Sequence, residues 1–198
     1  MVNRLPPFSF STKRRSDPMR WIVFSLVILV CLTQPTDLMA QDNPQLRDIP
    51  VSESPMLIPL PNAKQPEPDL LTGGQPSEAD LRAAAAAGYK TVINLRPGSE
   101  MAGFDESGLV ESLGMHFISI PIGGGADLTE EHARRLDRAI ATSNGLPVII
   151  HCASGNRVGA LLAVRANLIQ GKSAQEALAF GKAAGLTTLE DAVKQRLK

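Results

Sequence analysis

Short apolar runs that alternate with helix-forming stretches constrain the fold of this chain most strongly. Residues 89–95 (YKTVINL), 115–122 and 148–151 are apolar runs of strand length, and turn residues bound them. Helix-forming patterns over residues 77–87 and 105–113 precede the first and the second of these runs. Strands that alternate with helices through short links predict a mainly parallel sheet with helices on both faces. The expected fold class is therefore α/β, a three-layer sandwich.

Hydroxyl residues mark the expected starts of three helices. Ser77, Thr129 and Ser173 each precede a helix-forming stretch, and Glu176 completes a capping-box pattern with Ser173. A short strand is expected over residues 70–72, where the compact domain is expected to begin. We expect this domain to extend over residues 70–198.

The first 40 residues have the pattern of a secretory signal. A basic start is followed by an apolar run over residues 21–32 and by Ala40 at the expected cleavage site. The run is shorter than the roughly 20 residues that a membrane-spanning helix needs. We therefore expect an exported protein, periplasmic or extracellular. The alternative is a chain that keeps residues 21–32 as a membrane anchor, and only in that case is membrane contact expected.

Residues 41–69 are rich in proline and polar residues, which predicts a linker with at most one edge strand. Without residues 1–40 the chain has 15 basic and 18 acidic residues, a net charge of −3. This balance offers no basic face, so no nucleic-acid partner is expected. Removal of the same segment leaves Cys152 as the only cysteine, which excludes an internal disulfide and indicates a reactive or buried thiol.

The stretch VIIHCASGNRVGALLAV (residues 148–164) carries the strongest chemical pattern. An apolar strand ends at Cys152, the chain bends at Gly155, and a helix follows. The backbone amides of residues 153–158 can point inward, and the helix N-terminus favours both a bound anion and a thiolate. Arg157 adds a forked cation that suits a tetrahedral oxyanion. The pattern predicts a nucleophile with an anion site in front of it.

HCASGNRVGAL (residues 151–161) resembles the signature loop of cysteine-dependent phosphatases. More closely, the domain resembles the phosphatase-like domain of the bacterial beta-lactamase-hydrolase-like family. The further shared motifs are GGQPS (residues 73–77), TVINLRP (91–97) and AAGLTTLE (183–190). The resemblance implies a cysteine-phosphatase-like fold, related to the tyrosine and dual-specificity phosphatases.

The resemblance also implies roles for the loop residues. Cys152 would take the phosphoryl group of a phosphorylated small molecule or protein, Arg157 would hold the phosphate, and His151 would orient the loop. No metal and no organic cofactor would be needed. With His151, the implied substrate-binding residues are Ala153, Ser154, Gly155, Asn156 and Val158.

Three departures from the phosphatase pattern leave the reaction open. Four residues separate Cys152 from Arg157, where cysteine phosphatases usually have five, and Val158 stands where they usually have a hydroxyl residue. The expected general-acid loop reads IPIGGGADLT, in which Asp127 is the only carboxylate. Asp127 is thus the candidate acid, although a turn residue before a helix is an equal interpretation. Asp105 and Glu106 are weaker substitutes.

The sequence pattern is also compatible with two other functions. The four-residue spacing resembles that of single-domain rhodaneses, in which a cysteine persulfide passes sulfur to an acceptor without a general acid. A non-catalytic anion-binding module is the other alternative. The histidines show no close-spaced ligand pair beyond His151 and Cys152, so no metal site is expected.

Three polar residues lie near the same expected sheet edge without an assigned function. Asn94 and Arg96 close the strand over residues 89–95, and an exposed strand-end arginine is the expectation for Arg96. Gln75 belongs to the GGQPS motif, but its residue type alone indicates no chemistry.

Overall fold

A five-stranded sheet forms the centre of the domain. The computed structural model describes residues 58–101 and 103–198, so the predicted signal segment and most of the predicted linker lie outside the described residues. The strands follow the order β1-β2-β5-β3-β4, and only β1 is antiparallel to its neighbour. Their bounds are β1 Lys64–Glu67, β2 Leu70–Gly73, β3 Thr91–Asn94, β4 His116–Ser119 and β5 Val148–His151.

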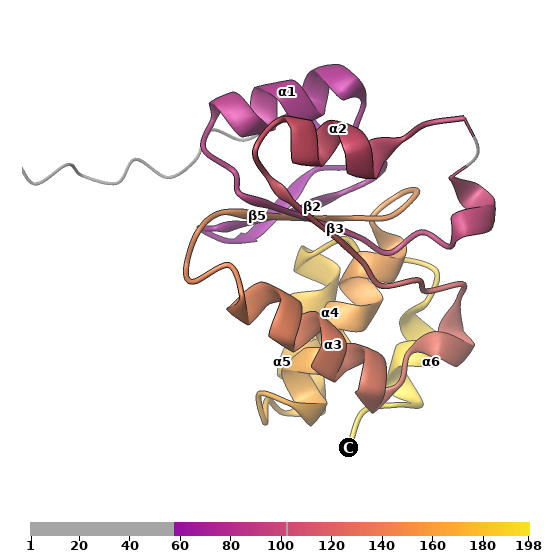
Figure 1. Ribbon diagram of the computed structural model, residues 1–198. Coiled ribbons are helices and arrows are strands. Elements are labelled where there is room, and N and C mark those ends of the chain that lie inside the picture. Colours follow the sequence, from indigo (N-terminus) through magenta and orange to yellow (C-terminus); the bar gives the residue numbers. More distant parts are fainter. Residues whose placement is uncertain (1–57, 102) are drawn as a thin grey trace, which may run out of the picture. The chain divides into compact units, whose positions relative to one another are not determined.

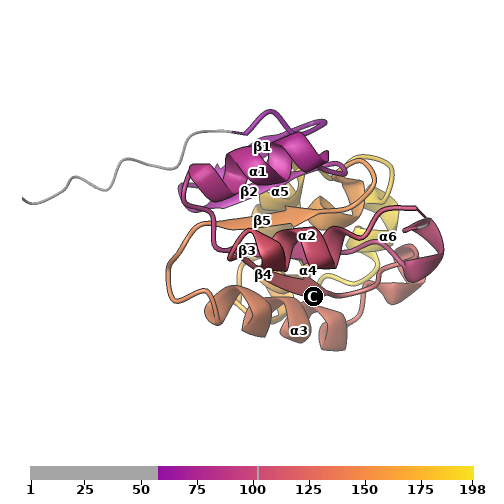
Figure 2. The ribbon, with the colours of Figure 1, turned by 45° about the horizontal axis from the view of Figure 1, so that its top comes forward.

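Helices cover both faces of this sheet, as Figures 1 and 2 show. Among the described residues, two helices pack on one face and four on the other, so the predicted three-layer α/β sandwich is confirmed. Short 3₁₀ turns η2 (Gly98–Glu100) and η3 (Gly125–Asp127) follow β3 and β4. The helices are α1 Glu78–Ala86 and α2 Glu106–Ser112 on the first face, and α3 Glu130–Ala141, α4 Asn156–Leu168, α5 Ala174–Ala183 and α6 Glu190–Lys194 on the second.

The predicted helix starts agree with the structure. The Ser77 hydroxyl accepts from the amide of Asp80 at the start of α1, and Ser173 accepts from that of Glu176 at the start of α5. Both starts are complete capping boxes. Thr129 caps α3 in the same way, although without the reciprocal bond.

Residues 58–69 belong to the compact unit, although the sequence placed them in the linker. Ile58 and Leu60 are buried against the α1 face of the sheet, and β1 pairs with β2. Prolines and polar residues dominate this segment because β1 is an edge strand, whose side chains are mostly exposed.

The parallel register brings three strand ends together. Gly73 of β2 and Asn94 of β3 both pair with His151 of β5, the last residue of the central strand. Ligands of open parallel sheets bind beyond this carboxyl edge. The register therefore places the GGQPS motif, the end of β3 and the residue before Cys152 side by side.

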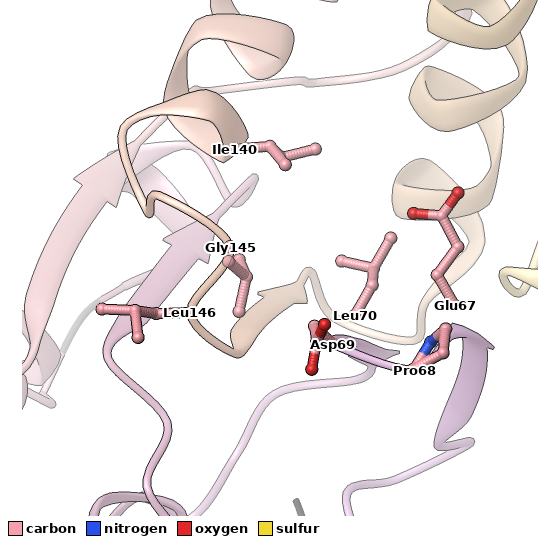
Figure 3. A pocket seen from close by; sticks show the side chains of 8 residues that line it. Glu67, Pro68, Asp69, Leu70, Ile140, Gly145 and Leu146 are labelled. Atoms are coloured by element: carbon pink, nitrogen blue, oxygen red, sulfur yellow. The ribbon is translucent and has the colours of Figure 1, made fainter. Parts of the chain in front are cut away.

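The opposite edge of the sheet holds a cavity of about 430 Å³, seen in Figure 3. Its lining includes Leu70 and Val148, which begin β2 and β5, and the carboxylates of Glu67 and Asp69. No nucleophile lines it, so the cavity is separate from the Cys152 loop. In the part of the chain that the structure describes, no helix has the length and apolar character needed to cross a membrane.

Candidate active site

Cys152 directly follows the carboxyl end of β5 and is 1% exposed. Its Sγ accepts a hydrogen bond from the amide of Gly155 at 3.1 Å. Gly155 has φ +92°, in the left-handed region that favours glycine, and this turn brings its amide onto the sulfur. The thiol therefore lies inside the bend of the loop, against a backbone donor.

Neighbouring segments hold the loop from outside. The amide of Cys152 donates to the carbonyl of Gly73 at 3.3 Å, and the amide of Gln75 donates to the carbonyl of Ala153 at 3.4 Å. The side chain of Asn62 donates to the carbonyl of Ser154 at 3.2 Å. The carbonyls of Ala153 and Ser154 are thus turned toward the GGQPS motif and residue 62, away from the interior of the loop.

The first turn of α4 supplies free donors to the same bend. Asn156, Arg157 and Val158 are its first three residues, and amides at these positions have no acceptor within a helix. The residue before them is Gly155, which has no side chain to accept a hydrogen bond from these amides. These donors and the positive end of the helix dipole make the bend next to Cys152 suited to an anion.

A carboxylate from η2 fixes the side chain of Arg157. Its Nη1 and Nη2 donate to the two carboxylate oxygens of Glu100 at 2.9 and 2.7 Å, and Nη1 also donates to the carbonyl of Ile122 at 2.8 Å. A guanidinium has five N–H donors, so Nε–H and one Nη2–H stay available for an anion. The pair with Glu100 raises the pKa of Arg157 against the effect of burial, and the nearby Cys152 adds to this increase.

The same contact holds the Glu100 carboxyl in its charged form. Its pKa is lowered, first by the hydrogen bond from Arg157 and then by its charge and the contacts of Arg96, while burial opposes the shift. Arg96 donates to the backbone carbonyl of Glu100, and its Nε lies 3.4 Å from Oε2. Arg96 is therefore a partly buried member of the site and not the exposed strand-end arginine that the sequence predicted.

A second carboxylate, Glu106, lies fully buried at the start of α2. The side-chain amide of Asn94 donates to its Oε2 at 2.7 Å, and that of Gln75 donates to its Oε1 at 3.1 Å. His151 Nε2 lies 2.9 Å from Oε1, but the ring N–H does not point at this oxygen and makes no hydrogen bond there. This close contact places a carboxylate behind the residue that precedes Cys152.

The candidate acids have different surroundings. Asp127 is half-buried in the loop after Ile122, and its Oδ2 accepts from the amide of Gly123 at 2.7 Å. Among the described residues, no hydrogen bond joins its carboxylate to Cys152 or Arg157. Asp105 caps α2 through the amide of Gly108, a bond that lowers its pKa.

The remaining predicted substrate-binding residues of the loop differ in exposure and in what their side chains contact. Ala153 and Ser154 are exposed, whereas the Val158 side chain is buried in the core and only its amide faces the bend. The Asn156 side chain bonds Thr188 and the amide of Thr187, so it anchors the TTLE segment to α4. Its side chain therefore supports the loop from behind.

Sequence reasoning missed Glu100 and assigned no role to Gln75. Glu100 follows β3 by a few residues in a polar turn, where a carboxylate is ordinary, so no local pattern distinguishes it. Over the described residues, no group of three or more His, Cys, Asp or Glu side chains could hold a metal ion.

Comparison with known families shows the same domain in other proteins. The family model described as "DSP-PTPase phosphatase fused to NAD+ Kinase" matches residues 59–196. A "Beta-lactamase hydrolase-like protein" of Xylella fastidiosa (strain Temecula1) is 34% identical over 121 residues, which are 59% of this chain and 27% of that protein. The chain thus matches about a quarter of the length of this curated relative.

Solved structures share the fold. A candidate phosphatase of the DUF442 group from Shewanella putrefaciens CN-32 superposes with a TM-score of 0.55 at 26% identity, over 70% of this chain and 92% of that one. Tk-PTP in the active form superposes with a TM-score of 0.54 at 22% identity, over 69% of this chain and 96% of that one. The expected cysteine-phosphatase-like fold and the resemblance to beta-lactamase-hydrolase-like proteins are both confirmed.

Proposed function

Because the chain belongs to the family of dual-specificity-type phosphatase domains described as fused to NAD+ kinase, we propose that it is a cysteine-dependent phosphatase. Its substrate would be a phosphoester on a small molecule or a protein. One observation carries this proposal: the buried Cys152 sulfur lies within the bend of a loop whose free amides and fixed arginine suit a tetrahedral anion.

The reaction would proceed through a phosphocysteine. The Cys152 thiolate forms a bond to phosphorus as the bond from phosphorus to the leaving oxygen breaks, and Asp127 gives that oxygen its proton. Water then attacks the phosphocysteine, the S–P bond breaks, and Asp127 accepts the proton of the water. The amides of residues 156–158 and the two free N–H groups of Arg157 stabilise the charge on the equatorial oxygens in both steps.

Sulfur transfer is the second candidate, because one feature of the site favours it. Only four residues close the ring from Cys152 to Arg157, and the side chain of Asn156 points away toward Thr188. A smaller ring suits a persulfide sulfur better than a phosphate, and such a reaction needs no general acid.

Hydrolysis of 4-nitrophenyl phosphate by the reduced protein tests the proposal. Turnover is expected in the unaltered protein, with inhibition by vanadate, and it should vanish in Cys152→Ser. Arg134→Lys serves as a control, because Arg134 is an exposed arginine paired with Glu130 on α3.

Absence of turnover above the Cys152→Ser background would overturn the phosphatase proposal. Incubation with thiosulfate followed by mass spectrometry then separates the alternatives. A gain of one sulfur atom that requires Cys152 would identify sulfur transfer, and an unchanged mass would leave an anion-binding module.

A further inference from the structure

Two residues that the proposed reaction does not use lie behind the Cys152 loop: the buried Glu106 and the half-buried Gln75. Glu106 is fully buried, yet it makes no hydrogen bond with Cys152 or with Arg157. A buried carboxylate is costly unless hydrogen-bond donors surround it. Its donors are the side-chain amides of Asn94 and Gln75, and His151 Nε2 lies 2.9 Å from its Oε1. A function of Glu106 would account for the free-energy cost of its burial.

Gln75 connects this carboxylate to the arginine side of the site. Its Nε2 donates to Glu106 and its Oε1 accepts from Nη1 of Arg96. Arg96 in turn contacts Glu100, which holds Arg157 through two hydrogen bonds. One side chain therefore uses both its donor and its acceptor to join two groups of opposite charge.

The contacts form one continuous path that begins and ends beside Cys152. His151 precedes the nucleophile and touches Glu106, and Arg157 closes the loop and is held by Glu100. Between the two carboxylates lie only Gln75 and Arg96. Members of a hydrogen-bonded polar network that is at least half-buried influence one another, so a change at one member alters the others.

We propose that Gln75 and Glu106 are a positioning pair, which fixes both ends of the Cys152–Arg157 loop through one hydrogen-bonded network. The Gln75–Glu106 bond keeps the Arg96–Glu100 unit in register with the carboxylate behind His151. Without it, the arginine side and the cysteine side of the loop move independently. The proposal rests on the proposed function only in that Cys152 and Arg157 form the reactive site.

Exchange of the two side chains gives a sharp test. In Gln75→Glu a carboxylate can still accept from Arg96, but it faces Glu106 without a donor between them. In Glu106→Gln the new side chain has a single oxygen, which accepts from Asn94. Its NH₂ group then faces the NH₂ group of Gln75, so the bond between residues 75 and 106 is lost. In the double variant Gln75→Glu/Glu106→Gln the new amide donates to the new carboxylate. The bond is then restored with donor and acceptor reversed, and the net charge is unchanged.

The readout is alkylation of Cys152 by iodoacetamide, followed by mass spectrometry, with and without inorganic phosphate. Each single variant is expected to weaken protection by phosphate about tenfold, because the Arg96–Glu100 unit that holds Arg157 is no longer in register with the cysteine side of the loop. The exchange variant is expected to bind phosphate within about threefold of the unaltered protein. Gln65→Glu and Glu111→Gln are matched exposed controls, and both should leave protection unchanged.

Two results would overturn the proposal: single variants that keep full protection, or a folded exchange variant that recovers none of it. Thermal melting of every variant identifies those that are unfolded. If the exchange variant is among them, Gln75→Leu decides alone, because it removes both bonds without adding a charge. If phosphate does not protect even the unaltered protein, the proposed function fails instead. The alkylation rate without phosphate then tests the pair, with at least a threefold change expected in the single variants and recovery in the exchange variant.

Discussion

At the scale of single residues, the arginine of the loop is fixed before any anion arrives. Arg157 uses three of its N–H groups on Glu100 and on the carbonyl of Ile122, which leaves a two-donor edge free. A side chain that is already ordered loses little entropy when a ligand binds. The two contacts also join η2 and the loop after Ile122 to the anion site.

The Arg157–Glu100 pair predicts a pH-dependent contribution to stability. The pKa of Glu100 is lowered below its ordinary value of 4.5, chiefly by the hydrogen bond from Arg157. A depressed folded-state pKa stabilises the protein above that ordinary value, and this contribution is lost as the pH falls through the folded-state pKa. In Glu100→Gln we expect Tm to fall by about 2–4 °C at pH 7.

Thermal melting in phosphate-free buffer between pH 7 and pH 3 checks this prediction. The difference in Tm between Glu100→Gln and the unaltered protein should shrink as the pH falls below 4.5 and through the lowered folded-state pKa of Glu100. Glu131→Gln is the control, because Glu131 is exposed at the start of α3. A difference that stays constant over this range would contradict the assignment of the effect to the charged pair.

Asp127 is predicted to act as a general acid and not as a residue that only maintains the structure of its loop. Asparagine keeps an oxygen that can accept from the amide of Gly123, so Asp127→Asn should preserve the loop. Loss of a general acid costs about 100-fold in rate when the leaving group is poor, and much less when it is good.

Turnover of phenyl phosphate and 4-nitrophenyl phosphate by Asp127→Asn measures this difference. We expect the larger loss with phenyl phosphate, whose leaving oxygen needs the proton more. Equal losses with both esters would assign Asp127 to loop structure, in agreement with its interpretation as a turn residue. Asp191→Asn, at an exposed position of α6, is the control.

At the scale of elements, local sequence patterns were sufficient for most starts and ends. Caps such as Ser77 and Ser173 act within one helical turn, so the residues that carry the signal are adjacent in sequence. The strand end before Cys152 and the bend at Gly155 were predictable for the same reason. These local rules locate the reactive loop but not the side chains that reach it from other elements.

The residues whose roles sequence analysis missed are far in sequence from the residues that they contact. Glu100 reaches Arg157 across 57 positions and Glu106 reaches Gln75 across 31 positions. No periodicity or cap marks such contacts, because they depend on the register of β3 with β5. Glu106 was considered only as a weak substitute acid, since its burial follows from the packing of α2 and not from its neighbours in sequence.

Close packing of α4 against α5 gives a prediction at this scale. A Cβ on Gly159 would lie 2.1 Å from the amide nitrogen of Leu186 and 2.5 Å from the carbonyl oxygen of Gly181, both of them backbone atoms. Gly159→Ala must therefore move α4 away from the segment after α5. We expect a loss of about 3 kcal/mol in the free energy of unfolding.

Urea denaturation measures this loss. Gly98→Ala is the matched control, because a Cβ there meets no atom within 4 Å. Its stability should stay within about 0.5 kcal/mol of the unaltered protein. Equal stability of Gly159→Ala and Gly98→Ala would contradict the close approach of α4 and α5.

At the scale of the whole molecule, the segment before β1 supports both the core and the site. Leu60 packs against Gly73, where an added Cβ would lie 3.0 Å from the Leu60 Cβ. Pro61 accepts from the amide of Gly74 at 2.6 Å, and Asn62 holds the carbonyl of Ser154. The sequence could not show this role, because a few apolar residues within a proline-rich stretch have no periodicity of their own.

Leu60→Ala is therefore predicted to affect stability and the Cys152 loop together. The Leu60 side chain is 4% exposed, so its truncation leaves a cavity and should cost about 2–4 kcal/mol in the free energy of unfolding. Because Gly73 lies against this side chain and its carbonyl accepts from the amide of Cys152, phosphate protection of Cys152 should also weaken at temperatures where the variant is fully folded.

Urea denaturation and the alkylation assay measure the two effects in one variant. Leu146→Ala is the control, since Leu146 is 49% exposed at the opposite edge of the sheet, and both readouts should be unchanged there. Full phosphate protection in a destabilised Leu60→Ala would show that the GGQPS motif holds the loop without help from residues 58–62. The segment would then support the core alone, and the loop would depend only on the sheet edge and on the network behind it.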